Sequence, residues 1–285
     1  MRNKKIRLTL QITAAVILVF TIVLAGIYFT GQNSASDNGE DFVAVLDVGQ
    51  ADSILICSNG KSALIDTGDE ITASELLRKL YSYGVDSLDA IIISHSHSDH
   101  AGALPKVLGS MPVGNVILPE FGADEKITEI TNATNKSEAK VYSAVEGMVI
   151  NIGDFELTVL ATDSSEEDIN NRSVIVMAAV FGNKFLFSGD AEKETEKDLI
   201  DSGINFDCDV LKVGHHGSNT SSTKSFLDIA TPEYAAISVG EGNSYGHPSN
   251  TVIDRLESVG AEVFRTDYMG DIVFNIENER IVRPQ

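Results

Sequence analysis

The segment His95-Ser96-His97-Ser98-Asp99-His100 places four side chains that can bind a metal ion within six residues. Three of the six histidines of the chain lie in it, so chance is a poor explanation for the cluster. Imidazole and carboxylate groups together suit zinc or a similar divalent ion. The alternative is a polar surface loop that happens to contain three histidines. We interpret the segment as a metal-binding loop, with His95, His97, Asp99 and His100 as candidate ligands.

The apolar run Ala90-Ile91-Ile92-Ile93 directly precedes this loop. A short apolar, β-branched run bounded by polar residues is typical of a buried strand, so the ligands leave the sheet at a rigid strand end. Five other candidate residues also follow expected strands: Asp66, Asp190, His215, His216 and His247. Catalytic groups are commonly found on loops that a rigid scaffold positions. We therefore expect all these residues to meet at one edge of the fold.

The pattern of apolar residues predicts strands alternating with helices over most of the chain. Strands are expected at 42–48, 53–57, 61–65, 90–93, 113–118, 141–145, 155–160, 174–181, 184–187, 210–213, 235–239, 262–265 and 271–276, and helices at 71–83, 101–108, 192–201, 223–229 and 250–258. In both halves, strands and hairpins give way to strand–loop–helix units, which indicates two sheets packed face to face with helices outside. Residues 120–140 are polar and weakly patterned, so we expect an insertion or lid there.

The first 30 residues differ in character from the rest. Four basic residues precede an uncharged, apolar stretch at 8–30, namely Arg2, Lys4, Lys5 and Arg7. This stretch can span a bilayer, which needs about 20 residues, and basic flanks favour a cytoplasmic N-terminus. A cleaved signal peptide is the alternative, but its apolar core is usually about 7–15 residues long. We predict a cytoplasmic tail and signal-anchor helix at 1–30, a polar linker at 31–41 and a folded domain at 42–285 outside the cell membrane.

The composition fits a globular domain with an acidic surface. Of the 285 residues, 43% are hydrophobic and 22% charged, and the net charge is −21. Without the four basic residues of the tail, 17 basic residues face 42 acidic ones, a net charge of −25. Such a surface repels polyanions, because nucleic-acid binding depends on lysine and arginine at the phosphates. Cys57 and Cys208 are too few for a disulfide scaffold, and two lone thiols are the simpler interpretation.

Several motifs together resemble a known superfamily. The spacing His95-X-His97-X-Asp99-His100 is similar to the signature of the metallo-β-lactamase fold, and Asp66-Thr67-Gly68 and Ser188-Gly189-Asp190 resemble two further motifs of it. More narrowly, the segments at 47–52, 211–218, 245–248 and 265–267 resemble the extracellular hydrolase domain of ComEC competence proteins. The resemblance covers about residues 42–276. It implies an αββα four-layer sandwich and a metal-dependent hydrolase, here a standalone relative without the multi-span channel part.

The resemblance also implies a ligand set for two divalent ions, with zinc expected and manganese as the alternative. His95 and His97 would bind the first ion, Asp99 and His100 the second, and Asp190 would bridge both. The second site would be completed by His216 or, less readily, by His215. Asp66 would orient the ligand imidazoles through hydrogen bonds.

One expected ligand is missing from the sequence. Many members of the superfamily supply a further histidine to the first ion, but no histidine lies between His100 and Asp190. Asn171 occupies a comparable place. An amide oxygen is a harder ligand than an imidazole, so its use would loosen the first site or shift its preference toward manganese.

The ligand set suggests a mechanism in which a metal-bound hydroxide attacks the substrate. We expect Asp99 to accept a proton and whichever of His215 and His216 is not a ligand, His215 by preference, to face the substrate. His247 is expected to protonate the leaving group or to contact a phosphate. Ser218 and Asn243 are candidate hydrogen-bond donors to a phosphate. A phosphodiesterase or nuclease, with DNA as a candidate substrate and no stable protein partner, is the favoured function. The alternatives are an esterase or phosphodiesterase acting on a small or cell-wall substrate, such as a phosphocholine-bearing polymer, and an inactive metal-binding interaction module.

Overall fold

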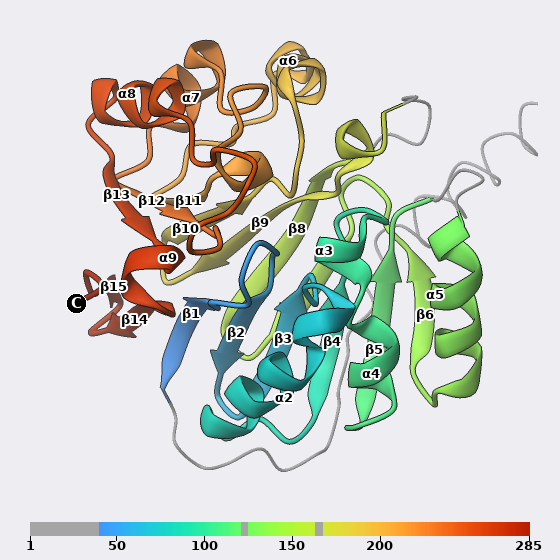
Figure 1. Ribbon diagram of the computed structural model, residues 1–285. Coiled ribbons are helices and arrows are strands. Elements are labelled where there is room, and N and C mark those ends of the chain that lie inside the picture. The colour runs from blue at the N-terminus through green and yellow to red at the C-terminus, as the bar shows by residue number, and fades with distance from the viewer. Residues whose placement is uncertain (1–39, 121–124, 163–167) are drawn as a thin grey trace, which may run out of the picture.

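The computed structural model describes residues 40–120, 125–162 and 168–285, which form two β-sheets (Figure 1). The first sheet has the strand order β15-β14-β1-β2-β3-β4-β5-β6 and the second β13-β12-β11-β10-β9-β8-β7. The strands of the first sheet are β1 (Asp41–Val45), β2 (Ile54–Ser58), β3 (Lys61–Ile65), β4 (Leu88–Ile92), β5 (Val113–Leu118), β6 (Lys140–Ser143), β14 (Ile272–Glu277) and β15 (Arg280–Ile281). Those of the second are β7 (Val149–Ile152), β8 (Phe155–Ala161), β9 (Ile175–Val180), β10 (Asn183–Phe187), β11 (Val210–Lys212), β12 (Tyr234–Ile237) and β13 (Glu262–Arg265).

Helices cover the outer face of each sheet (Figure 1). Between the strands β3 and β6, the chain forms the short helix η1 (Glu70–Thr72) and the helices α2 (Ala73–Ser82), α3 (Ser98–Ala101), α4 (Leu104–Leu108) and α5 (Glu125–Lys136). The second half contributes η2 (Asn170–Arg172), α6 (Lys193–Ser202), η3 (Gly214–Gly217), α7 (Lys224–Ala230), α8 (Asn250–Ser258) and α9 (Thr266–Met269). Over the described residues this is an α/β sandwich with the layer order αββα, as expected from the sequence.

Three apolar clusters hold the layers together. The side chains of Ile54 and Ile56 in β2 lie in the cluster between the sheets, whereas Leu55 lies in the cluster under α2. Successive side chains of a strand point to opposite faces, so a strand covered on both faces is apolar throughout. Leu76 and Leu80 of α2 lie one turn apart and pack on the same cluster as Leu55. This pattern explains why the central strands were recognisable as continuous apolar runs.

One edge of the sandwich collects the loops that carry the candidate ligands. Strands β3 to β6 are parallel in the first sheet, and β10 to β13 are parallel in the second. The carboxyl ends of parallel strands lie at the same edge, which is where α/β proteins place their sites. The loops after β3, β4, β10 and β11 therefore start on neighbouring strands of each sheet.

The opposite edge is closed by direct contact between the two sheets. The turn between β2 and β3, which contains Asn59 and Gly60, lies against the turn between β7 and β8. Asn59 Nδ2 donates to Asp154 Oδ2 at 2.8 Å, and the Asp154 N–H donates to Ser58 Oγ at 2.9 Å. A Cβ atom on Gly153 would lie 2.3 Å from Ser58 Oγ, so only glycine permits this approach. The sheets are thus joined at this edge without any metal ligand.

The structure differs from the expectations in three segments. Residues 125–136, within the expected insertion or lid, form helix α5, which packs beside α4. Only a narrow stripe is buried among its described side chains, with Ile130 and Thr134 one turn apart, so the sequence shows little apolar periodicity. Strand β7 and the one-turn helix α9 were also not predicted.

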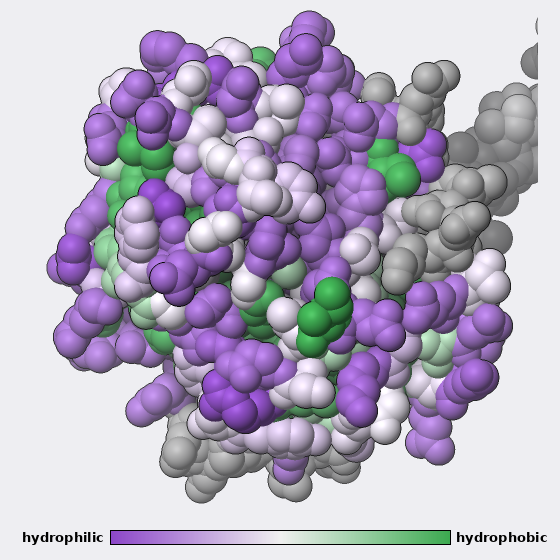
Figure 2. Space-filling view, viewed as in Figure 1, coloured by the Kyte–Doolittle hydropathy of each residue, from purple (hydrophilic) through white to green (hydrophobic). Residues whose placement is uncertain are grey.

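The predicted anchor at 1–30 and most of the linker lie outside the described residues. Within the described part of the chain, no helix is long and apolar enough to cross a membrane. The face shown in Figure 2 is mostly hydrophilic, with hydrophobic residues in small separate groups. Cys57 and Cys208 are free thiols, as expected.

Candidate metal centre

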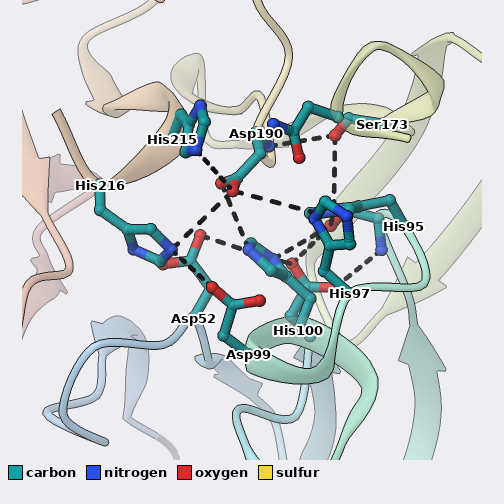
Figure 3. A network of polar contacts seen from close by, with 12 residues as sticks. Asp52, His95, His97, Asp99, His100, Ser173, Asp190, His215 and His216 are labelled. Atoms are coloured by element: carbon teal, nitrogen blue, oxygen red, sulfur yellow. Dashed lines mark hydrogen bonds and ion pairs between the residues drawn. The ribbon is translucent and has the colours of Figure 1, made fainter. Parts of the chain in front are cut away.

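Four of the predicted ligands meet at the edge formed by the strand ends (Figure 3). Asp99, His100, Asp190 and His216 each offer one ligand atom, and these atoms lie within 4.8 Å of one another. His100 Nε2 lies 3.3 Å from Asp190 Oδ1, and His216 Nε2 lies 3.3 Å from Asp99 Oδ2. His216 Nε2 is also 3.9 Å from Asp190 Oδ2. Residues from the loops after β4, β10 and β11 thus form one compact cluster.

Three further histidines lie around Asp190, with His95 and His97 on the side away from His216, and with His215 next to His216 (Figure 3). His95 Nε2 is 4.0 Å from Asp190 Oδ2 and 3.1 Å from His97 Nδ1. His215 Nε2 is 3.8 Å from Asp190 Oδ2. Asp190 therefore lies between two groups of imidazoles, the place that the sequence predicted for a bridging ligand.

The polar atoms at the centre of the cluster suit a divalent ion. His100 Nε2 and Asp190 Oδ1 are buried and, among the described residues, have no hydrogen-bond partner. Burying such atoms unpaired is costly, and a cation bound between them would remove that cost. Imidazole nitrogen and carboxylate oxygen are the donors that zinc and related ions take in catalytic sites. The residues present therefore fit the divalent ions that the sequence implied.

Asp66 fixes the orientation of the His100 ring, as predicted. It follows β3 with a positive φ of 60°, and its Oδ2 lies 2.8 Å from His100 Nδ1. The same carboxylate accepts hydrogen bonds from the Ser94 N–H and hydroxyl, both at 2.7 Å. With Nδ1 of His100 donating to Asp66, Nε2 is the nitrogen that faces Asp190 and is free to bind an ion.

The pair His215-His216 lies in η3, where both residues have left-handed backbone angles. Their φ values are 49° and 52°, a conformation that costs about 1–3 kcal/mol for each non-glycine residue. Such strain is typical of functional sites, and here it aims two consecutive rings at the same edge. His216 Nδ1 lies 3.0 Å from the Ser238 carbonyl oxygen, which leaves Nε2 toward the cluster. His216 Nε2 therefore points into the cluster, the orientation expected of a ligand there, and His215 lies on the more exposed side.

Glu192, which the sequence analysis missed, contacts His215. Its Oε1 lies 3.1 Å from His215 Nδ1 and accepts a hydrogen bond from the Thr220 hydroxyl at 2.9 Å. The His215 side chain is 23% exposed, and its Nε2 lies on the side of Asp190. The sequence did contain a signal for this role. Glu192 is a second carboxylate only two residues after Asp190, so it can reach the loops that Asp190 reaches.

The side chains of Asn171 and Asn243, two predicted site residues, form hydrogen bonds within the protein. Asn171 Oδ1 accepts from the Glu192 N–H at 3.1 Å and from the Thr195 hydroxyl at 3.0 Å. This oxygen is engaged in holding the Glu192 loop, so the expectation that it replaces a histidine ligand does not agree with the geometry. Asn243 Nδ2 donates to the His247 carbonyl oxygen at 2.7 Å.

Two other predicted residues lie farther from the cluster. The His247 ring centroid is 5.8 Å from that of His215, and the Tyr245 ring stacks on its other side. Ser218 Oγ lies 3.0 Å from Thr220 Oγ1, beside the Glu192 contact. Contacts of Ser218, Asn243 and His247 with a substrate stay predictions.

Burial and mutual charge set the protonation of the metal-free site. Burial alone would raise the pKa of Asp190, but the His100 and His216 charges hold that pKa well below its usual range. Burial would lower the pKa of His216, but Asp190 and Asp52 raise it to about 10. Burial and the His100 charge lower the pKa of His95 well below its usual value. The cluster thus combines an ionised carboxylate with a neutral imidazole at His95.

Comparison with known proteins agrees with this geometry. Residues 46–241 match the family model of the metallo-β-lactamase superfamily, which covers more than half of the chain. The protein therefore belongs to this superfamily and is a metal-dependent hydrolase. Its Asp/His cluster has the donor atoms and spacing to hold divalent metal ions.

Among curated relatives, the similarity to competence proteins is confirmed. The chain is 30% identical over 263 residues to ComE operon protein 3 of Bacillus subtilis, covering 85% of this chain and 34% of the relative. It is 32% identical over 259 residues to competence protein ComA of Neisseria gonorrhoeae, covering 90% of this chain and 35% of the relative. The chain thus spans about a third of the length of these relatives.

Solved structures share the fold. The metallo-β-lactamase fold protein YhfI from Bacillus subtilis superposes with a TM-score of 0.54 at 16% identity. The alignment covers 82% of this chain and 99% of YhfI. CmlA, a diiron β-hydroxylase from Streptomyces venezuelae, gives a TM-score of 0.57 at 14% identity, covering 86% and 54%. At these identities the likeness concerns the fold alone.

Proposed function

We propose that this protein is a phosphodiesterase of the ComEC-like type that uses two divalent ions, zinc or alternatively manganese, and that its substrate class is DNA. The observation that carries the proposal is the place of Asp190 between the His95–His97 pair and the Asp99, His100 and His216 group. Two ions held on either side of one carboxylate would activate water and stabilise charge on the attacking and leaving oxygens of a phosphodiester. The similarity to competence proteins supports DNA as the substrate.

The protein's own residues have separate tasks in this reaction. Asp99, whose side chain is 31% exposed, is the ligand that can also accept a proton from the attacking water. His215 faces the open side and donates a proton to the leaving oxygen, while Glu192 holds its Nδ1. His247, next to His215, is placed to contact the phosphate.

A small phosphodiester, including a phosphocholine-bearing one, is the second candidate substrate. The chain is strongly acidic, and a polyanion needs lysine and arginine at its phosphates. Lys212 is buried in an ion pair with Asp52, and Lys224 is paired with Asp228 at 2.6 Å. Two of the basic residues that could contact a polyanion are thus engaged with carboxylates, and this is the observation in favour of the second candidate.

Three substrates separate these possibilities. The full chain, loaded with zinc or manganese, is incubated with bis-p-nitrophenyl phosphate, single-stranded DNA and nitrocefin. We expect cleavage of the bis-ester, lost in Asp190→Asn and retained in the exposed control Asp201→Asn. Cleavage of the bis-ester without DNA would select the small substrate. Hydrolysis of nitrocefin alone, or no hydrolysis by metal-loaded protein, would overturn the phosphodiesterase proposal.

We also propose that residues 1–30 anchor the protein in the cell membrane with residues 42–285 outside. The apolar stretch at 8–30 and the four basic residues before it support this orientation. Protease added to intact cells is expected to digest the domain and spare the N-terminal tail. Recovery of undigested protein from the cytoplasmic fraction would contradict the anchor.

A further inference from the structure

Beneath the ligand cluster lies a buried ion pair between Asp52 and Lys212. Both side chains are 1% exposed, and Lys212 Nζ lies 2.6 Å from Asp52 Oδ2. The same ammonium donates to the Val213 carbonyl oxygen at 2.9 Å. Fully buried lysines are rare, and removing two charges from water often costs more than their attraction returns. Stability alone is therefore a poor reason for this pair.

The pair joins the two halves of the site. Asp52 lies between β1 and β2 of the first sheet, and Lys212 is the last residue of β11 in the second. The backbone N–H of Asp52 also donates to the Asp99 carbonyl oxygen at 2.9 Å, so Asp52 is fixed to the loop of the first ligands. Lys212 is four residues before His216 on the chain. The ion pair thus sets the distance between the ligands that each sheet contributes.

The Asp52 carboxylate contacts the two imidazoles of the second site on the side away from Asp190 (Figure 3). Its Oδ1 lies 3.3 Å from His216 Nδ1, and its Oδ2 lies 3.9 Å from His100 Nδ1. The Nδ1 of His100 has Asp66 as its close partner at 2.8 Å, whereas the Nδ1 of His216 lies between the Ser238 carbonyl oxygen at 3.0 Å and Asp52 Oδ1 at 3.3 Å. Among the described residues, Asp52 is therefore the only carboxylate in contact with the back of the His216 ring. A carboxylate behind a ligand imidazole fixes the ring and raises its basicity.

The first-site histidine His95 has different supports. Its Nδ1 contacts the Ser94 hydroxyl at 3.0 Å and the Ser173 hydroxyl at 3.5 Å. Asp52 is not among the contacts of His95 within the described part of the chain. A change at Asp52 or Lys212 therefore acts on one metal site and leaves the supports of the other in place.

We propose that Lys212 and Asp52 are positioning residues for the second metal site, in which Lys212 holds the carboxylate of Asp52 and Asp52 holds His216 in liganding orientation. Lys212 also balances the charge of a carboxylate that would otherwise add to Asp66, Asp99 and Asp190 in a buried space.

Metal binding by the full-length, metal-free protein tests this inference. Lys212→Met, Asp52→Asn and the double variant are titrated with Co²⁺, followed by visible absorption, with bound metal counted by elemental analysis. Lys197→Met is the matched control, because Lys197 forms an exposed pair with Asp201. In each single variant we expect second-site affinity to fall by about 10–100-fold while first-site affinity stays within about twofold. If the wild type binds a single ion, the affinity for that ion should fall in both single variants.

The double variant separates positioning from folding. It leaves no unpaired buried charge, so it is expected to melt closer to the wild type than Lys212→Met does and still to bind the second ion more weakly than wild type. A double variant or folded single variant that binds both ions with wild-type affinity would overturn the inference, as would equal losses at both sites. Because no substrate is used, the result stands apart from the phosphodiesterase proposal.

Discussion

The two sides of Asp190 differ in how firmly their histidines are held. On the second-site side, His100 and His216 are buried and each has an acceptor behind Nδ1, Asp66 or the Ser238 carbonyl. On the other side His95 is buried, but His97 is half-buried, and so is His215 at the rim beside His216. Ring orientation fixed in advance lowers the cost of binding an ion. The His100 and His216 rings, which define what we call the closed side, are therefore held more rigidly than the half-buried rings of His97 and His215, which define the open side.

The largest effect is expected where the two sides meet. Asp190→Ala removes the carboxylate between both groups, so both ions should bind weakly. Since metal ions contribute several kcal/mol to such reactions, hydrolysis of bis-p-nitrophenyl phosphate should fall on the order of 10³-fold. Steady-state rates and elemental analysis measure this. A variant that keeps two ions and most of its activity would remove Asp190 from the centre of the site.

Alanine at His97 and at His216 sharpens the comparison. His97→Ala should retain the ion of the closed side and lose about 10²-fold in rate, whereas His216→Ala should lose the closed-side ion. Metal stoichiometry after dialysis distinguishes the two variants. If both variants retained the same number of ions, metal binding on the two sides of Asp190 would be coupled, against the expectation from their separate contacts.

A smaller effect is expected at the support of the open side. Glu192→Gln keeps a side chain of the same shape near His215 but removes its charge. We expect kcat to fall about 10-fold with unchanged metal content, because Glu192 orients His215 without touching an ion. The control Glu194→Gln changes an exposed neighbour on α6. Loss of metal in Glu192→Gln would instead make His215 a ligand.

The smallest effect concerns the metal-free protein. The pKa of His216 is raised from 6.5 to about 10 in the folded state, so its protonation stabilises the fold fully below pH 6.5, and this stabilisation is lost as pH rises through about 10. In the presence of chelator, the melting temperature of the wild type should exceed that of His216→Gln most below pH 6.5, and the difference should disappear above pH 10. A constant difference across this range would contradict the assignment.

The sequence predicted the ligands better than it predicted their supports. Residues 95–100 could be recognised because their spacing is local, and the apolar runs before them marked strands that are buried on both faces. Glu192 and the Asp52–Lys212 pair were missed because their partners lie far away along the chain, 160 residues for the ion pair. Asn171 was misjudged because its residue type does not reveal where its oxygen points.

The contact of Ser58 and Asn59 with Asp154 fastens one end of the sandwich permanently. At the other end the sheets meet through charged groups, namely the Asp52–Lys212 pair and the candidate metal ligands. Chelation should therefore let the sandwich loosen from one end only, with faster amide hydrogen exchange at Ile65, Ile92 and Phe187 than at the hairpin turns. Metal binding would therefore control how tightly the two sheets are held together at the site edge, in addition to the hydrolytic reaction.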